Sequence, residues 1–295
     1  MIYSYLLTKE ETSLKDALKE LDKSFDKAHE LYFYLMQLMV DLTDLQARRL
    51  DDARNKYLPS YEDLHPNTRF VDNEFIATLR ATEAFSDYIE ENKLSWRNDD
   101  IFLKVMLERV THSKEYEKYM SAESTDFARD CQFWKDLMRH VILPDEGLAD
   151  ILENKSVYWN DDLETMGTFT VKTIKRFEDK VEDPILPMYK DNEDSEFGKT
   201  LFTKAVEMRA ANDEIINAMI SGKWDAERIA FMDRVIMGVA ITEVKEFISI
   251  PTSVTLNEYI EIAKYYSTPK SGSFVNGILN NVIKDFKSRR IIVKD

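Results

Sequence analysis

Apolar residues recur at alternating steps of four and three along the first long segment of the chain. The segment follows Ser13, which forms a capping-box pattern with Asp16, a signal for a helix N-terminus. Steps of four and three place the side chains on one helix face, as in a heptad seam. Additional apolar residues widen that face beyond a two-stranded seam, so the pattern favours a long helix in a bundle over a dimeric coiled coil. The seam residues are Leu14, Leu18, Leu21, Phe25, Ala28, Tyr32, Leu35, Met39 and Leu42.

Helical periodicity continues through the rest of the chain, with two breaks rich in proline and turn residues. These breaks are expected at 58–73 and 181–196, because proline interrupts the hydrogen bonds of a helix. Only 7 Gly and 7 Pro occur in 295 residues, which fits a mostly helical protein. The sequence therefore predicts an all-α fold, with helices near 74–92, 99–120, 124–142, 160–180, 195–220, 225–247, 255–267 and 271–288.

The stretch SGSFVNGILNNVIKDF near the C-terminus contains an Asn-Gly pair, which is typical of a β-hairpin turn. Its apolar residues instead recur at i, i+1, i+4 and i+5, which gives one stripe on a helix. Ser271 or Ser273 is expected to cap this helix, with Pro269 just before it. Gly277 lowers helix stability by about 1 kcal/mol relative to alanine. We therefore expect it to have a packing or contact role, most simply close packing.

Charge is unevenly distributed along the sequence. The formal net charge is −15, but from Lys264 to Lys294 there are seven basic residues and one acidic residue, Asp285. A local basic face attracts polyanions even when the rest of the surface repels them. A solvated surface run is the alternative explanation.

Patterns that carry catalytic or metal chemistry are scarce. The sequence has no glycine-rich phosphate loop and no HExxH motif. The stretch DNEDSEFGKTLF fails as a calcium loop, because Glu196 and Phe202 replace the required glycine and glutamate. A di-iron bundle needs two Glu-x-x-His pairs, and only Glu62–His65 matches. We therefore expect a protein without enzymatic activity, cofactor or metal.

The single cysteine and the hydropathy bear on cellular location. With Cys131 as the single cysteine, an intramolecular disulfide framework is excluded, which fits a reducing cytoplasm. Cys131 itself is interpreted as a packed thiol rather than a nucleophile. No stretch approaches the roughly 20 apolar residues that span a bilayer. The start MIYSYLLTKEE also lacks the basic region and cleavage site of a signal peptide. We expect a cytoplasmic protein with no membrane association.

Three segments follow one another in the last quarter of the chain: WDAERIAFMDRVIMGVAITEV, SVTLNEYIEIAKYYS and PKSGSFVNGILNNV. In their order and spacing they resemble the NusB family of bacterial transcription antitermination factors. A weaker similarity places MIYSYLL at the end of the family's first helix. In relatives an arginine-rich RNA-binding stretch precedes that point, so we expect the native start to lie upstream or the chain to be shortened. The matching residues are Asp233, Arg234, Ala240, Glu243, Leu256, Asn257, Glu258, Glu261, Ala263, Lys264, Ser271, Phe274, Val275, Asn276, Gly277, Ile278 and Leu279.

The resemblance implies a NusB-like helical bundle with an enlarged helical middle region. The expected division is 1–58 for an N-terminal segment, 59–194 for an inserted or enlarged acidic region, and 195–295 for a C-terminal NusB-like subdomain. The resemblance also implies a factor that pairs with NusE, a small-subunit ribosomal protein, to bind boxA RNA. In the RNA polymerase antitermination complex such a pair supports transcription of ribosomal RNA operons.

Candidate contact residues follow from this reading. RNA sequence is read mainly in single strands, by stacking bases on aromatic rings and by hydrogen bonds to their edges. Helix-start amides and hydroxyls can bind phosphate. RNA contacts are expected from Lys270, Ser271, Ser273, Phe274, Asn276, Lys284, Lys287, Arg289 and Arg290, and the resemblance implies partner contacts from Tyr3, Asp233 and Arg234.

Each of these residues also has a structural alternative. Phe274 lies on the apolar stripe and fits a core position. Asn276 could satisfy local backbone groups, and Asp233 and Arg234 could bridge neighbouring helices.

Two other functions stay open. A helical interaction scaffold that has lost RNA binding fits the acidic middle region and the missing arginines. The alternative is a relative of the NusB-like domain of ribosomal RNA cytosine methyltransferases. Those enzymes continue into a cofactor-binding α/β domain, and this chain has no strand–glycine-loop–helix unit to match it.

Overall fold

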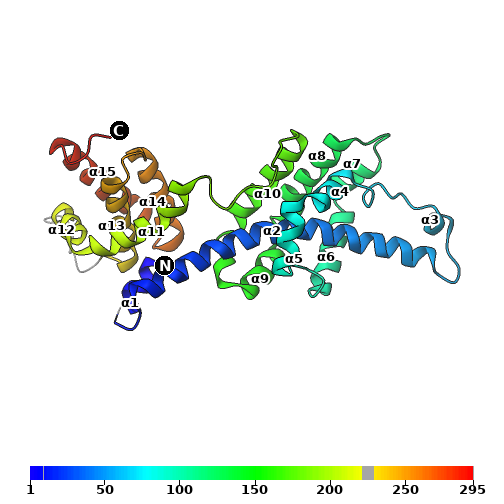
Figure 1. The fold of residues 1–295 in the computed structure, drawn as a ribbon, viewed down its shortest axis with the longest axis horizontal. Helices are drawn as coiled ribbons and strands as arrows, with labels where there is room; N and C mark the ends of the chain where they lie inside the picture. The colour runs from blue at the N-terminus through cyan, green and yellow to red at the C-terminus, as the bar shows by residue number, and fades with distance from the viewer. Residues whose placement is uncertain (9, 221–228, 295) are drawn as a thin grey trace. The chain divides into compact units, whose positions relative to one another are not determined.

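The computed structural model of the protein describes residues 1–8, 10–220 and 229–294. Within those ranges all regular secondary structure is helical, which confirms the all-α prediction (Figure 1). The expected helix at 225–247 begins outside the described residues, since positions 225–228 are not among them. No helix in the described ranges combines the length and apolar character needed to cross a membrane.

One helix, α2 with 41 residues, is much longer than all the others in the described ranges. Their bounds are α1 (Ile2–Thr8), α2 (Leu14–Arg54), α3 (Tyr61–Leu64), α4 (Glu74–Ala81), α5 (Glu83–Asn92), α6 (Asp100–Thr111), α7 (Lys114–Met120), α8 (Phe127–Leu137), the π-helical η1 (Met138–Ile142), α9 (Glu146–Lys155), the 3-10 turn η2 (Val157–Trp159), α10 (Leu163–Glu178), α11 (Asn192–Glu207), α12 (Arg209–Ile220), α13 (Phe231–Glu246), α14 (Thr252–Tyr266) and α15 (Ser271–Ser288).

The chain divides into two compact units. Unit 1 comprises Met1–Lys23 and Tyr189–Asp295, and unit 2 comprises Ser24–Met188. The expected region 195–295 lies within unit 1, and most of the expected region 59–194 lies within unit 2. The three-segment division itself stays a prediction.

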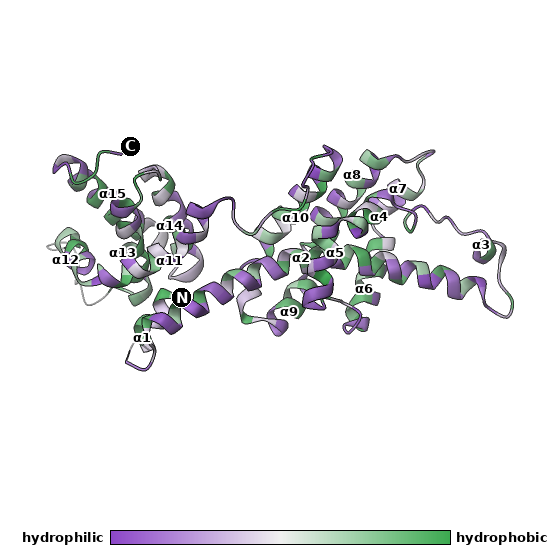
Figure 2. Ribbon diagram, in the orientation of Figure 1, coloured by the Kyte–Doolittle hydropathy of each residue, from purple (hydrophilic) through white to green (hydrophobic). Residues whose placement is uncertain are grey.

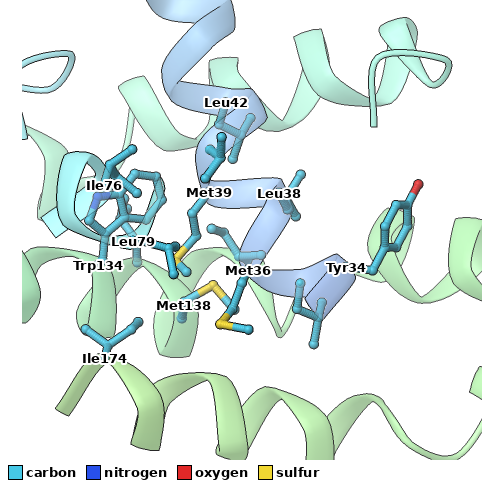
Figure 3. Packing of buried hydrophobic residues seen from close by; sticks show 14 of the residues in the cluster. Tyr34, Met36, Leu38, Met39, Leu42, Ile76, Leu79, Trp134, Met138 and Ile174 are labelled. Atoms are coloured by element: carbon cyan, nitrogen blue, oxygen red, sulfur yellow. The ribbon is translucent and has the colours of Figure 1, made fainter. Parts of the chain in front are cut away.

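The core of unit 2 surrounds the middle of α2. Every side chain from Leu31 to Thr43 is buried, so this part of α2 is covered on all sides. Figure 3 shows Met36 and Met39 of α2 close to Leu79 and Trp134 from other helices. The bundle interpretation of the long apolar segment is therefore confirmed for unit 2.

Some expected helices are divided, and two were missed, the first being the short α3 inside the expected break at 58–73. The expected helix at 74–92 breaks at Thr82, between α4 and α5. The expected helix at 99–120 breaks before Ser113, whose hydroxyl accepts a hydrogen bond from Tyr116 N at 3.1 Å and so caps α7. Helix α9 lies in a stretch that contains Pro144 and Gly147 and was not predicted. Asp145 caps it by accepting from Leu148 N at 3.1 Å.

Unit 1 packs α11 to α15 around a smaller core. The inner side of α13 buries Met237 and Ala240, and α15 buries the apolar stripe expected from its sequence. Hydrophobic and hydrophilic faces are visible on these helices in Figure 2. The buried stripe of α15 consists of Val275, Ile278, Leu279, Val282, Ile283 and Phe286.

Candidate nucleic-acid interface

The start of α15 is fastened to α13 by Ser271. Its buried hydroxyl donates to Asp233 Oδ2 at 3.0 Å and accepts from Thr268 N at 3.1 Å. The N-cap residue is Lys270 and no side chain caps it. The expectation that Ser271 or Ser273 caps the helix is therefore wrong, because both residues lie inside the helix. Ser273 Oγ instead donates to Lys270 O at 3.0 Å.

The two glycines of α15 lie in opposite environments. A Cβ on Gly272 would lie 2.8 Å from Lys264 Cγ and 3.6 Å from Ile260 O, so α14 approaches closely there. A Cβ on Gly277 would meet no atom of the described residues within 4 Å. The close-packing interpretation of Gly277 is therefore wrong, and the close-packed glycine is Gly272. Gly277 instead leaves backbone of α15 open at the surface.

An exposed polar stripe runs along α15 through Gly277. Ser273 and Lys284 are exposed and share this side of the helix with the glycine, four residues before it and seven after it. Asn276, also exposed, directly precedes Gly277 and lies three residues after Ser273. Asn280, half-buried, donates through Nδ2 to Asn276 O at 2.9 Å. The structure thus places three of the predicted contact residues around one open stretch of backbone.

Phe274 is half-buried beside this stripe. One part of its ring packs against the core cluster of unit 1, as expected for a core position. The other part is exposed to solvent. Contact between Phe274 and a base stays a prediction.

Basic residues gather at the C-terminal end of α15. Lys287, Arg289 and Arg290 are exposed, and Arg289 Nη1 donates to Asp285 Oδ2 at 3.1 Å. Arg290 adopts a left-handed φ of 57° as the helix ends. Lys270 lies at the other end of the 18-residue helix, roughly 27 Å away at 1.5 Å per residue. The structure therefore separates Lys270 from the C-terminal cations.

The three predicted partner-binding residues lie near the start of α13. The Tyr3 ring is 5.2 Å from that of Phe231. Asp233 is only 5% exposed and accepts the Ser271 hydroxyl, while its Oδ1 has no hydrogen-bond partner among the residues that the structure describes. Arg234 Nη1 donates to Asn217 Oδ1 at 3.0 Å. Asp233 and Arg234 thus bridge α13 to α15 and α12, and their contact with a partner stays a prediction.

A small cavity lies between α1, α11, α12 and α13. Its volume is about 70 Å³, far below the roughly 300 Å³ of small-molecule pockets. Arg209, which lines it, places its guanidinium 5.7 Å from the Phe231 ring centre. Sequence reasoning missed Arg209, because it lies outside the three matching segments.

Glu243 of the matching segments has a structural role that its sequence position did not indicate. The carboxylate is 6% exposed and accepts Thr255 Oγ1 at 2.7 Å and Tyr259 OH at 2.9 Å. Burial, and then the negative charge of Glu243, raise the pKa of Tyr259 above its usual value. Lys294 Nζ also donates to Phe247 O at 2.7 Å, just past the end of α13. These contacts tie α13 to α14 and to the C-terminal segment.

Two exposed aromatic rings at the end of α14 were also missed. Tyr265 is 76% exposed and Tyr266 is 46% exposed, next to the cation of Lys264. In sequence this run continues the apolar periodicity of α14, so only the structure distinguishes it from core. Within the described ranges, no cluster of three or more His, Cys, Asp or Glu side chains is arranged to hold a metal ion.

The geometry of unit 1 suits binding, since an open helix face ends in exposed cations. The family model described as "NusB family" matches residues 161–284, which include α10 to α14 and most of α15. The transcription antitermination protein NusB of Bacillus cereus is 43% identical over 90 residues, 30% of this chain and 68% of that protein. The chain belongs to the NusB family.

Other relatives cover similar parts of the chain. NusB of Salinibacter ruber is 38% identical over 100 residues, covering 34% of this chain and 62% of that protein. NusB of Dictyoglomus thermophilum is 38% identical over 91 residues, covering 31% of this chain and 62% of that protein. The chain thus spans less than two thirds of the length of these two relatives. No solved structure matches it.

Proposed function

We propose that the protein is a transcription antitermination factor that binds boxA RNA together with NusE. It acts by binding in the cytoplasm, as part of the RNA polymerase antitermination complex on ribosomal RNA operons. The observation that carries this proposal is the open backbone at Gly277, inside the segment shared with NusB proteins. This glycine lowers helix stability and packs against none of the residues that the structure describes, which is accounted for by a ligand that approaches the helix backbone.

The RNA strand would run along α15. Ser273 and Asn276 offer hydrogen bonds beside Gly277, and the exposed part of Phe274 offers a stacking surface. The exposed rings of Tyr265 and Tyr266 add two further stacking surfaces. Phosphate contacts are assigned to Lys270, Lys284, Lys287, Arg289 and Arg290. Ser271 acts indirectly, because its buried hydroxyl holds the start of α15 on Asp233.

NusE would bind near the start of α13, beside Tyr3 and Arg234. The exposed part of Tyr3 supplies apolar surface there, and Arg234 retains some exposure beside Asn217. Asp233, being buried, supports this surface through its bond to Ser271 rather than presenting its carboxylate.

A protein scaffold without RNA binding is the second candidate function. Unit 2 holds 34 Asp and Glu against 21 Lys and Arg, a net charge of −13 out of −15 for the whole chain. A strongly acidic unit repels RNA and favours a protein partner. The two functions differ in whether the cations of unit 1 contact phosphates.

Salt-dependent binding of fluorescent boxA RNA, with and without NusE, tests the proposal. A plot of log binding constant against log salt concentration has a negative slope, and loss of one phosphate contact makes this slope less steep by about 0.7 for a single strand. We expect this decrease for Lys284→Ala, and no change for Lys104→Ala, a matched exposed lysine in unit 2. Gly277→Leu, which places a side chain in open space, should weaken RNA binding while the helical content is retained.

Two results would contradict the RNA proposal. If Gly277→Leu binds boxA RNA as tightly as the unmodified protein does, the open backbone at Gly277 does not contact the RNA. Absence of RNA binding, while NusE still binds, would leave the scaffold function.

A further inference from the structure

A groove of about 580 Å³ lies between α7 and α8 of unit 2. It is lined by residues from Lys114 to His140 and lies entirely outside the segment that matches the NusB family. Nothing in the proposed function uses it.

The groove has an aromatic floor and a rim of mixed charge with a small basic excess. The rings of Tyr119 and Phe133 stack in parallel with centres 3.9 Å apart, and both side chains are nearly buried. Lys114, Lys118 and Arg129 are exposed around them, and the acidic Glu115 and Asp136 line the same groove. Glu115 lies 3.4 Å from His140 Nδ1 and Arg129 pairs with Asp126, whereas neither lysine forms an ion pair with any residue in the described ranges. Three basic and two acidic side chains give the lining a formal charge of +1, on a unit whose net charge is −13.

A second unassigned feature of unit 2 is the segment 57–64, here called the arm, which follows α2 and ends with α3. Tyr57 is 97% exposed, Leu58 83%, Tyr61 77% and Leu64 50%. Single exposed apolar side chains are ordinary, but a contiguous group of large ones marks an interaction surface. The arm thus presents four large apolar side chains to solvent.

The arm is held in shape by local polar contacts. Ser60 and Asp63 form a capping box, with Asp63 N donating to Ser60 Oγ at 3.1 Å and Ser60 N donating to Asp63 Oδ2 at 2.9 Å. Lys56 Nζ lies 3.0 Å from Asp63 Oδ1. Glu62 is exposed on the same turn, so an acidic group accompanies the apolar side chains.

We propose that the arm of one copy of this chain docks into the α7–α8 groove of a second copy, and that the exchange is reciprocal. The arm is apolar and acidic, whereas the groove has an aromatic floor and a lining with a net positive charge, so the two surfaces are complementary in both respects. A second copy satisfies both surfaces without any other partner.

The base of the arm supports a two-fold arrangement. Asn67 Nδ2 donates to Met120 O at 3.1 Å, and Arg69 Nη1 donates to Tyr119 O at 2.7 Å. The arm is therefore anchored at the C-terminal end of α7, directly beside the groove of its own chain. In a two-fold dimer, the arm of each copy faces the groove of the other copy. Because arm and groove are neighbours on each copy, a single interface contains both arm–groove contacts.

Sedimentation analysis across a range of protein concentrations tests the proposal. We expect a monomer–dimer equilibrium, and a roughly 30-fold increase in the dimer Kd for Tyr61→Ser, the loss expected for an aromatic anchor. Tyr61 is exposed, so this change should leave the helical content intact. Glu90→Lys, an exposed charge reversal on α5, is the matched control for the acidic group of the arm and should not change the Kd.

Charge reversal distinguishes exchange between copies from docking within one chain. Glu62→Lys and Lys118→Glu should each weaken self-association, because arm and groove then carry the same charge. A mixture of the two variants should form a heterodimer, since each arm then meets a groove of opposite charge on the other copy. A chain that stays monomeric at every concentration would overturn the proposal. So would a dimer that Tyr61→Ser leaves unchanged, or a mixture that does not associate.

Discussion

Removal of the Tyr259 hydroxyl is expected to destabilise unit 1 through Glu243. The phenol donates to Glu243 Oε2 at 2.9 Å, and each of the two side chains is only 6% exposed. Tyr259→Phe keeps the ring and its packing but leaves one oxygen of a buried carboxylate without a donor. The second oxygen keeps its bond from Thr255 Oγ1 at 2.7 Å.

The expected loss is about 2 kcal/mol of unfolding free energy. Hydrogen bonds to charged groups contribute about 1.5–3 kcal/mol, and an unsatisfied buried charge lies at the upper end. In a Glu243→Gln background the same change should cost about 1 kcal/mol, because the acceptor is then neutral. A coupling of about 1 kcal/mol between Glu243 and Tyr259 follows.

Urea unfolding followed by circular dichroism measures these differences. Tyr265→Phe is the matched control, because Tyr265 lies in the same helix and is 76% exposed, and it should change nothing. A loss below about 0.5 kcal/mol for Tyr259→Phe, or equal losses in both backgrounds, would show that the Tyr259–Glu243 hydrogen bond does not stabilise unit 1 in this way.

The same contact predicts a pH effect. Because the pKa of Tyr259 is higher in the fold than in the unfolded chain, its contribution to stability is complete below pH about 10. That contribution falls as the pH rises further, since the phenol then ionises in the unfolded chain first. When the pH is raised from neutral to alkaline, the unfolding free energy of the Tyr259→Phe variant should therefore fall by less than that of the unmodified protein.

Two further predictions concern α15 and the cysteine. Gly277→Ala should raise the unfolding free energy by about 0.5–1 kcal/mol, since the added methyl meets only open space. Gly272→Ala should lower it, because Lys264 Cγ lies 2.8 Å from the new atom; the same urea titration compares the two, and a reversed order would contradict the assignment. Burial raises the pKa of Cys131 to about 12, so the native thiol should resist iodoacetamide at pH 8 and react after unfolding, as mass spectrometry would show. Rapid native modification would contradict its packed position.

Local periodicity in the sequence correctly predicted most helices and the burial of α2. The stretch around Gly277 illustrates why: its apolar spacing fits only a helix, whatever the Asn-Gly pair suggests in isolation. The same logic indicated that α2 is too broadly apolar for a coiled-coil seam. The ends of helices were predicted less accurately. Ser113 caps a new helix where the periodicity predicted one continuous helix, and Asp145 caps a helix in a stretch that contains proline and glycine.

The roles of the candidate residues depended on neighbours that are distant in sequence. Ser271 matches the family pattern, yet only the approach of α13 shows that its hydroxyl is used by Asp233, 38 positions away. Sequence also could not distinguish Gly272, which lies against α14, from Gly277, which faces open space.

Residue order alone was enough to predict the all-helical class, the long helix with its buried middle and the kinship of the last quarter of the chain. These properties depend on residue order within a few helical turns, and that order is fully present in the sequence. Which surfaces stay open became visible only in the packed fold, and these surfaces are the Gly277 backbone, the arm and the α7–α8 groove. Exposure is set by the elements that do or do not pack against a residue, and that information lies in contacts between distant segments.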